Sequence, residues 1–188
     1  MMGMERGFSM NNDMDQIILV DLSDNEIGSA NKMDAHFQCL LDRAFSIFIV
    51  NNGKMLVQKR NKNKYHSGGL ITNACCSHPR KGELLEEAIH RRLLEEMGMD
   101  CPLEEISSFV YRNVFENGIT EYEFDHVFIG MYDGDFNADP EEAECAEWVN
   151  IEELSKDVLD NPQKYTVWFI SALPKVLEFL RRTSEKND

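Results

Sequence analysis

The chain has 188 residues, 43% of them hydrophobic, which is enough for one sizeable core but not for two comfortable domains. Nineteen Lys and Arg against 34 Asp and Glu leave a net charge of −15, which repels nucleic-acid backbones and anionic membranes. The sequence shows no apolar run of membrane-spanning length, no secretion signal, and five irregularly spaced cysteines. We therefore expect a reduced, cytoplasmic protein that binds neither nucleic acid nor membrane.

The first half of the chain predicts strands followed by a loop. Residues 16–22 are typical of a buried strand, and residues 43–50 and 54–60 predict a hairpin on an Asn-Asn-Gly turn, whose residues tolerate positive φ. Residues 61–82 lack a period and contain several glycines. They predict a long loop of the kind that carries function.

The clearest helix follows that loop. Residues 82–98 repeat apolar side chains at helical spacing, with acids in the first turn and Gly98 as the C-cap. Residues 103–115 and 119–132 then predict a second hairpin, on a Glu-Asn-Gly turn. These segments indicate an α+β protein.

Three acids share one face of the second strand of that hairpin. Glu121, Glu123 and Asp125 alternate with Tyr122, Phe124 and His126, so the two sets point to opposite sides of the sheet. Carboxylates make a poor core. The acidic face is therefore either exposed to solvent or lines a cation-binding cleft.

The remaining segments complete the expected organisation. Residues 143–151 predict a short strand, residues 152–160 a short helix, and residues 164–182 a terminal helix interrupted near Pro174. The expected division is a flexible N-terminus at 1–14, one domain at 15–182 and a flexible tail at 183–188.

Residues 77–99 are similar to the Nudix pattern, in which acids on one helix face hold divalent metal against a diphosphate. The matching residues are Glu83, Arg91, Glu95, Glu96 and Gly98. Ser77 stands where the pattern has Gly, and Arg92 where it has the first metal-binding Glu. A guanidinium in that array would grip phosphate oxygens, which favours binding a diphosphate without cleaving it. The alternative is a surface ion pair between Arg92 and Glu96, worth at most about 0.5 kcal/mol.

Three further motifs accompany this altered pattern: TNACCSHP at 72–79, AFS at 44–46 and EYE at 121–123. With them, the chain resembles the type 1 isopentenyl-diphosphate isomerases from about Asp15 to Leu177. The resemblance implies a Nudix-like α/β/α sandwich with a mixed sheet and the Nudix-type helix at 83–97. It also implies interconversion of isopentenyl and dimethylallyl diphosphate, through a tertiary carbocation formed by protonating one side of a double bond.

The resemblance places the family's catalytic cysteine at Cys76 and its catalytic glutamate at Glu123, with Cys75 as a bystander. The reaction needs an acid and a base on opposite faces of a flat allylic unit in a dry pocket. Tyr111 and Trp168 occupy positions where the family keeps aromatic residues that stabilise positive charge, and Tyr111 is placed to relay a proton with Glu123. Taken alone, Cys76 would be a buried structural cysteine and Trp168 a core residue.

The resemblance also implies a metal site. Its expected ligands are His36, Asp42, His78, Glu121 and Glu123. Asp42 stands where the family has a further histidine, and a carboxylate hardens the site toward Mn²⁺ or Mg²⁺, so the expected ion is Mn²⁺, Zn²⁺ or Mg²⁺. His66 in the neighbouring loop is an alternative ligand, although a surface imidazole is the plainer interpretation. His36 by itself would be an ordinary, partly exposed histidine.

The substrate's diphosphate needs cations. The resemblance implies a Mg²⁺ ion at Glu96, which bridges to the diphosphate. It nominates as further cations Lys32, Arg60, Lys64 and Arg92. The alternative for Arg60 and Lys64 is an ordinary basic surface loop. Ser67 and Gly68 replace an aromatic residue and a proline of the family, which predicts a looser pocket mouth.

Three hypotheses follow. The first is a metal-dependent isomerase of a small-molecule prenyl diphosphate, acting as a monomer or weak dimer. The second is a Nudix hydrolase of a nucleoside or other diphosphate, against which Arg92 argues. The third is a catalytically silent diphosphate- or partner-binding module, which has no chemical need for Cys76, His78 and Glu123 together.

Overall fold

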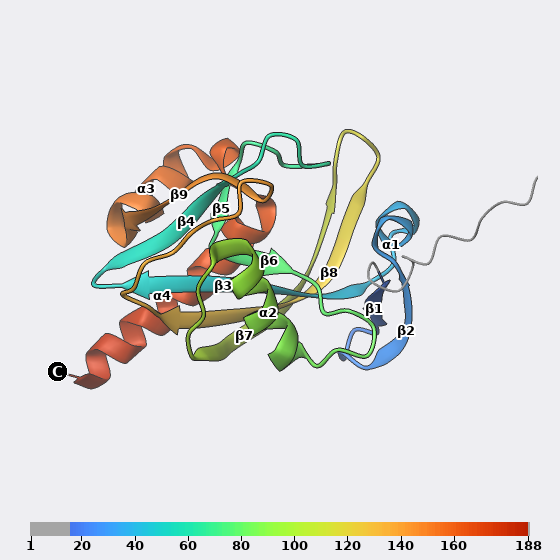
Figure 1. Ribbon diagram of the computed structural model, residues 1–188, viewed down its shortest axis with the longest axis horizontal. Coiled ribbons are helices and arrows are strands. Elements are labelled where there is room, and N and C mark those ends of the chain that lie inside the picture. The colour runs from blue at the N-terminus through green and yellow to red at the C-terminus, as the bar shows by residue number, and fades with distance from the viewer. Residues whose placement is uncertain (1–15, 188) are drawn as a thin grey trace, which may run out of the picture.

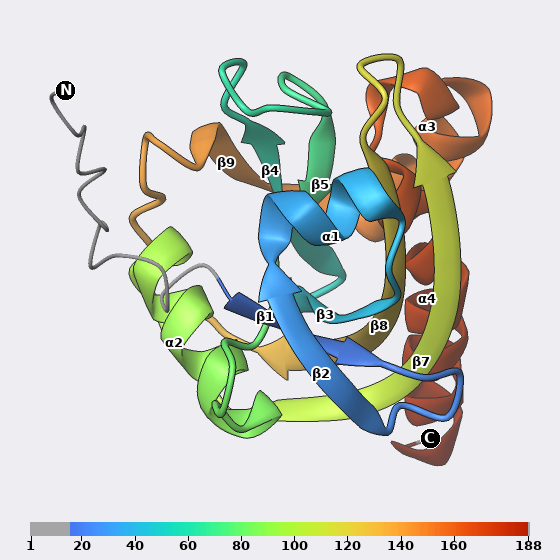
Figure 2. The same ribbon diagram turned by 90° about the vertical axis from the view of Figure 1, so that its right-hand side faces the viewer.

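The computed structural model describes residues 16–187 (Figures 1 and 2), so the expected flexible N-terminus at 1–14 lies outside the described residues. Within this range the strands are β1 Gln16–Val20, β2 Glu26–Asn31, β3 Asp42–Asn51, β4 Lys54–Arg60, β5 Ile71–Asn73, β6 Cys75–Ser77, β7 Leu103–Val114, β8 Thr120–Met131 and β9 Ala143–Asn150. The helices are α1 Lys32–Gln38, α2 Leu85–Met97, α3 Ile151–Asp160, the short 3₁₀ turn η1 Pro162–Lys164, and α4 Val167–Asn187.

Strand β3 is the centre of the sheet. Along one edge it pairs in parallel with β8, and along the other it pairs antiparallel with β1, β6 and β4 in turn. The outer strands extend this arrangement, because β7 pairs with β8 and β9 with β4. Parallel and antiparallel pairing in one sheet confirms the expected mixed sheet.

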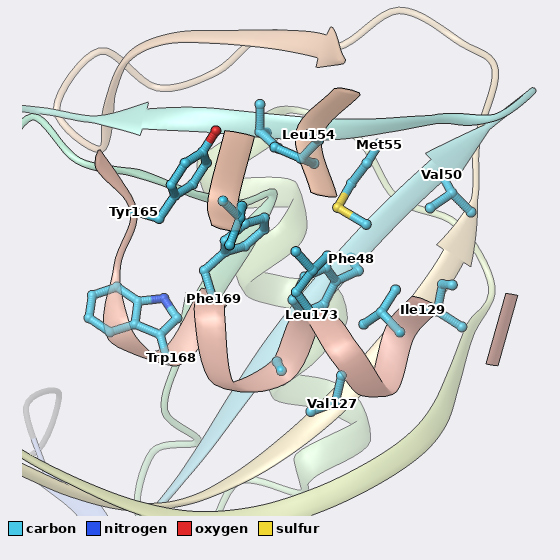
Figure 3. Packing of buried hydrophobic residues seen from close by; sticks show 14 residues of the cluster. Phe48, Val50, Met55, Val127, Ile129, Leu154, Tyr165, Trp168, Phe169 and Leu173 are labelled. Carbon is cyan, nitrogen blue, oxygen red and sulfur yellow. The ribbon is translucent and has the colours of Figure 1, made fainter. Parts of the chain in front are cut away.

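The side chains of β3 alternate between two apolar layers. Phe45 and Ile47 belong to the layer that packs against Ile89 of α2. Phe48 belongs to the opposite layer with Phe169 of α4, and the two rings stack with centroids 5.7 Å apart (Figure 3). Helices α2 and α4 thus cover opposite faces of the sheet (Figure 1). The expected α/β/α sandwich is confirmed.

Parts of the chain differ from the sequence-based expectation. Residues 61–82 are not all loop, because they contain β5 and β6. Strand β2 and helix α1 were not predicted. Strand β2 pairs with β1, which directly precedes it in the chain. Strand β6 instead pairs with β3, some thirty residues earlier, so no local pattern indicates β6.

The terminal helix is also longer than expected. Helix α4 continues through Pro174 and includes residues 183–187, which were expected to form a tail. A proline inside a helix costs about 3 kcal/mol or more. Phe169, Leu173 and Val176 are buried on the sheet along this helix, and their burial offsets that cost. No helix among residues 16–187 is long and apolar enough to cross a membrane.

Glu83 fastens the loop before α2 to that helix. Its carboxylate accepts hydrogen bonds from the Arg80 backbone N–H at 2.8 Å and from Arg91 Nε and Nη2 at 2.5 and 2.8 Å. The loop begins directly after β6, which carries Cys76. Glu83 and Arg91 of the Nudix pattern are therefore structural residues in this fold.

We predict that Glu83→Gln lowers the free energy of unfolding by about 1–2 kcal/mol at pH 7, because a charge-assisted pair is lost. The hydrogen bonds from Arg91 lower the pKa of Glu83 below 4.5, so its stabilisation is present above that pH and is lost as the pH falls through the folded-state pKa. Denaturant unfolding at pH 7 and below pH 4 should show the difference between variant and wild type shrinking in acid. The exposed Glu26→Gln is the matched control, and an equal loss in both variants would contradict the prediction.

Candidate active site

The polar site occupies the same face of the sheet as the α4 layer, beyond its apolar residues. One cross-strand row joins Asp42 of β3 to Glu123 of β8 and Tyr111 of β7, and another pairs Ser46 of β3 with Cys76 of β6. Strands β6 and β8 flank β3 on opposite edges. Cys76 and Glu123 therefore reach the cavity that both of them line from opposite sides.

Two histidines join this row from other elements. His36 comes from α1 and His78 from the segment after β6, and their ligand atoms lie within 4.8 Å of one another and of Asp42. His78 Nε2 is 3.4 Å from Asp42 Oδ1 and 3.2 Å from Glu123 Oε1. His36 Nε2 is 3.8 Å from Asp42 Oδ2 and 4.0 Å from Glu123 Oε1.

This cluster fits a divalent cation. His36 and Asp42 are 1% and 0% exposed, yet both ring nitrogens of His36 and both carboxylate oxygens of Asp42 make no hydrogen bond to the described residues. Leaving such groups buried and unsatisfied is costly. An ion accepting an imidazole nitrogen and carboxylate oxygens would satisfy them, and this donor set suits Zn²⁺ or Mn²⁺.

The pKa values of the residues in this cluster shift in different directions. Burial, assisted by His78 and Lys32, lowers the pKa of His36 to about 3, so its imidazole is neutral, as a metal ligand must be. Burial and Lys32 act to lower the pKa of His78 as well, but Glu123 and Asp42 outweigh them and raise it to about 9. Burial raises the pKa of Asp42 to about 6. A bound cation would replace the His78 proton as the positive charge.

Glu121 and Glu123 share Tyr111 as a neighbour, but their pKa values shift in opposite directions. The Tyr111 hydroxyl lies 2.7 Å from Glu123 Oε2 and 3.1 Å from Glu121 Oε2. Burial and the neighbouring Glu123 raise the pKa of Glu121 to about 8. Burial opposes ionisation of Glu123 too, but His78 and Tyr111 outweigh it and lower its pKa to about 2. Of this buried pair, Glu123 is the ionised member.

His66 does not lie on the surface, which was the plainer interpretation of its sequence. It is 7% exposed, and its Nε2 atom lies 2.9 Å from Glu121 Oε1, a close polar contact that is not aligned as a hydrogen bond. Its ring stacks on Phe115 with centroids 4.3 Å apart and meets Tyr65 edge-on at 4.3 Å. His66 is therefore one of the residues that line the pocket, and the looser pocket mouth expected from Ser67 and Gly68 stays a prediction.

The wall of the pocket contains Cys76, Trp168 and two cations, Lys32 and Arg60. Burial raises the pKa of Cys76 to about 12, although Arg60 opposes the shift, so the thiol keeps its proton. Trp168 donates its indole N–H to Thr72 Oγ1 at 2.8 Å, and the Arg60 guanidinium lies over the indole ring, 5.2 Å from its centroid.

A second, cationic cleft of about 220 Å³ adjoins this pocket and shares Lys32, Ser77 and His78 with it. The cleft is also lined by Arg80, Arg91 and Arg92.

Arg92 is bound by Glu96, and Lys64 by Glu142, while Arg92 Nη2 also lies 3.3 Å from Glu142 Oε1. Glu96 is buried and lines neither cavity. The structure therefore separates Glu96 from the histidine cluster.

Some residues of the site were missed by sequence reasoning. Glu142 follows β8 in an irregular segment, and no motif marks it as the partner of Lys64 and Arg92. The contact between Ser46 Oγ and Asp125 Oδ2, at 2.9 Å, could have been inferred, since Asp125 shares a strand face with Glu123. Tyr65 carried no signal, because its role depends on the fold of its loop.

The fold and the site define a Nudix protein, and residues 40–169 match the family described as NUDIX domain. The structure is similar to a crystal structure of a Deinococcus radiodurans protein, with a TM-score of 0.71 and 18% identity over 85% of this chain and 98% of that chain. It is also similar to a MutT NUDIX hydrolase from Burkholderia pseudomallei, with a TM-score of 0.58 and 21% identity over 72% of this chain and 98% of that chain. These likenesses show the fold.

Sequence relatives narrow the class further. The chain is 53% identical to isopentenyl-diphosphate Delta-isomerase 2 of Photorhabdus laumondii subsp. laumondii, over 83% of this chain and 89% of that protein. It is 47% identical to isopentenyl-diphosphate Delta-isomerase of Serratia proteamaculans, over 85% of this chain and 89% of that protein. The chain therefore belongs to the isopentenyl-diphosphate Delta-isomerase family, and the expected resemblance is confirmed.

We predict that Asp42→Asn weakens Mn²⁺ binding at least tenfold, because an amide oxygen replaces a buried carboxylate in the donor set. Isothermal titration of the metal-free protein measures this affinity directly. Asp157→Asn, on α3, is the matched control and should bind as the wild type does. Unchanged affinity in Asp42→Asn would remove Asp42 from the metal site.

Proposed function

We propose that the protein interconverts isopentenyl and dimethylallyl diphosphate, the activity named for its relatives. The observation that carries the proposal is the placement of Cys76 and Glu123 on opposite sides of one buried pocket. Moving a double bond by one carbon requires one proton to arrive at the terminal alkene carbon and another proton to leave the carbon on the other side of the central, cationic carbon. A thiol and a carboxyl group facing each other meet that need.

The protonation states of the two groups support one acting as proton donor and the other as proton acceptor. Cys76 carries its proton and Glu123 is ionised, so one donor and one acceptor are present at neutral pH. When one group gives its proton to the alkene, the double-bond electrons form the new C–H bond and leave a tertiary cation. The other group then takes a proton from a carbon next to the cationic carbon, and the electron pair of that C–H bond forms the new double bond. The two groups exchange roles for the reverse reaction.

The cation between these two steps needs an environment that stabilises it without attacking it. An aromatic face does so through its quadrupole. Trp168 lines the pocket and already has the cationic Arg60 over its ring, so this indole accepts a positive charge. Tyr111 orients Glu123 through their 2.7 Å hydrogen bond.

The metal would be held by His36, Asp42, His78 and Glu123, whose donor atoms the fold brings together. A divalent ion there would supply a fixed positive charge that holds the buried carboxylates in place. Glu121 lies beside this group and would extend it. The ion would be Mn²⁺, Zn²⁺ or Mg²⁺.

The diphosphate would bind toward the cationic cleft. Lys32 and Arg92 line it, while Arg60 faces the reactive pocket and Lys64 joins Arg92 through Glu142. Glu96, which lines neither cavity in this structure, would be the protein ligand of a Mg²⁺ ion bound with the substrate, and the ion would supply positive charge beside the diphosphate. Arg92 holds Glu96 in this structure, so substrate binding must exchange that ion pair for contacts with phosphate.

The location, oligomeric state and partners of the enzyme are also part of the proposal. We propose a cytoplasmic enzyme that acts as a monomer or weak dimer on a small molecule and binds no nucleic acid. The net charge of −15 supports the last point, because the cations near the site are a local exception on an acidic chain.

We predict that the metal-replete protein converts isopentenyl diphosphate into dimethylallyl diphosphate without releasing phosphate. The reason is Arg92, which replaces an acid that a hydrolase would use to collect metal and activate water. Proton NMR follows the isomer, and a phosphate and pyrophosphate assay follows hydrolysis in the same tube. Release of phosphate, or neither product, would overturn the proposal in favour of a different diphosphate substrate.

We predict that Cys76→Ala and Glu123→Gln each lower kcat by at least a thousandfold, because each removes one of the two proton-transfer groups. Cys75→Ala is the matched control, since Cys75 belongs to the opposite, α2 layer and does not line the pocket. Thermal unfolding should show all three variants folded. Near-normal turnover by Cys76→Ala, or equal losses in both cysteine variants, would contradict the assignment.

A further inference from the structure

His66 is the least expected member of the pocket. It lies in the connection between β4 and β5, in which the other residues are partly or fully exposed. Its own ring is buried, stacks on Phe115, and meets Tyr65 and Trp168 edge-on, the last at a centroid distance of 5.9 Å. Contacts with three aromatic rings restrict the orientation of this polar ring.

The backbone conformation of this loop positions the His66 ring in the pocket. Ser67 adopts a positive φ of 52°, and a Cβ added at Gly68 would lie 2.6 Å from the Lys62 carbonyl oxygen. The Gly69 N–H donates to the Arg60 carbonyl at 3.0 Å, and the Arg60 N–H donates to the Leu70 carbonyl at 2.9 Å. These bonds and the absence of a side chain at Gly68 hold the loop close to β4.

The buried ring meets one carboxylate, that of Glu121. His66 Nε2 lies 2.9 Å from Glu121 Oε1, while the Tyr111 hydroxyl lies 3.1 Å from Oε2. On its other side, His66 Nδ1 lies 3.3 Å from Ser67 Oγ. Glu121 therefore has a polar group beside each of its oxygens: the Tyr111 hydroxyl donates a hydrogen bond to Oε2, and the His66 imidazole lies close to Oε1 without being aligned as a hydrogen bond.

We propose that His66 is a positioning residue for Glu121, which it holds in the orientation that the metal and the reacting carbons require. This inference rests on the proposed function, because Glu121 matters only if the cluster binds metal or substrate. Residues that orient a ligating carboxylate commonly contribute tenfold to a hundredfold to metal affinity. Because His66 acts through the Glu121 carboxylate, its effect on metal affinity must disappear when that carboxylate is replaced.

The test is a double-mutant cycle on Mn²⁺ affinity, measured by isothermal titration of metal-free protein. We expect His66→Leu to weaken binding about tenfold, and His66→Gln, which keeps a polar N–H near the Nε2 position, to recover most of the loss. In a Glu121→Gln background, His66→Leu should weaken binding by less than twofold. His90→Gln, on the outer surface of α2, is the matched control and should bind as the wild type does.

Steady-state kinetics provide a second measurement. His66→Leu should lower kcat more than it raises KM, because Glu121 faces the reacting groups and lies away from the cationic cleft. Thermal unfolding identifies a variant that has simply lost its fold, and His66→Gln then carries the test. Wild-type Mn²⁺ affinity in His66→Leu, equal losses in the Leu and Gln variants, or additive losses with Glu121→Gln would each overturn the inference.

The metal titration also separates this inference from the proposed function. If the wild type binds Mn²⁺ but does not isomerise isopentenyl diphosphate, the proposed function fails, and the cycle still decides the role of His66. If the wild type isomerises the substrate and the cycle shows no coupling, only the inference about His66 fails. A wild type that binds no Mn²⁺ overturns the inference as well.

Discussion

The parallel pairing of β3 with β8 is the contact on which the rest of the site depends. It sets Asp42 beside Glu123 and continues toward Val50 and Met131, so one sheet face changes from polar to apolar along its length. Helix α4 covers the apolar end, and the carboxylates at the polar end are buried as well. Carboxylates that would otherwise be hydrated are therefore forced to find partners within the protein.

That burial explains the distribution of charge. Several acids and histidines share a small volume, and they cannot all be ionised without large repulsion. Glu123 remains charged because His78 and Tyr111 contact it, and Glu121 and Asp42 shift toward their neutral forms. The cluster is consequently a poor source of stability by itself and a good receptor for a cation.

The Nudix pattern of this chain keeps its structural residues and changes one of its metal-binding positions. Glu83 and Arg91 still fasten the loop to α2, whereas Arg92 places a guanidinium among Glu95, Glu96 and Glu142. The cations that would receive a diphosphate are thereby held at the edge of the reactive pocket. In the proposed function, the charged end would bind in one cavity and proton transfer would occur in the other, and the two cavities share Lys32 and His78.

Features that depend on local periodicity could be predicted from the sequence alone. Both hairpins, helix α2 with its Gly98 cap, and the shared face of Glu121 and Glu123 follow from spacing, because side chains repeat at fixed intervals in helices and strands. The TNACCSHP and EYE motifs pointed to Cys76 and Glu123 by resemblance. Which groups meet depends on tertiary contacts: β6 and α1 had no local signal, and the burial of His66 depends on Phe115 and Tyr65. Such contacts join residues far apart in the chain, and their energies come from packing and exclusion of water, which no short stretch of sequence records.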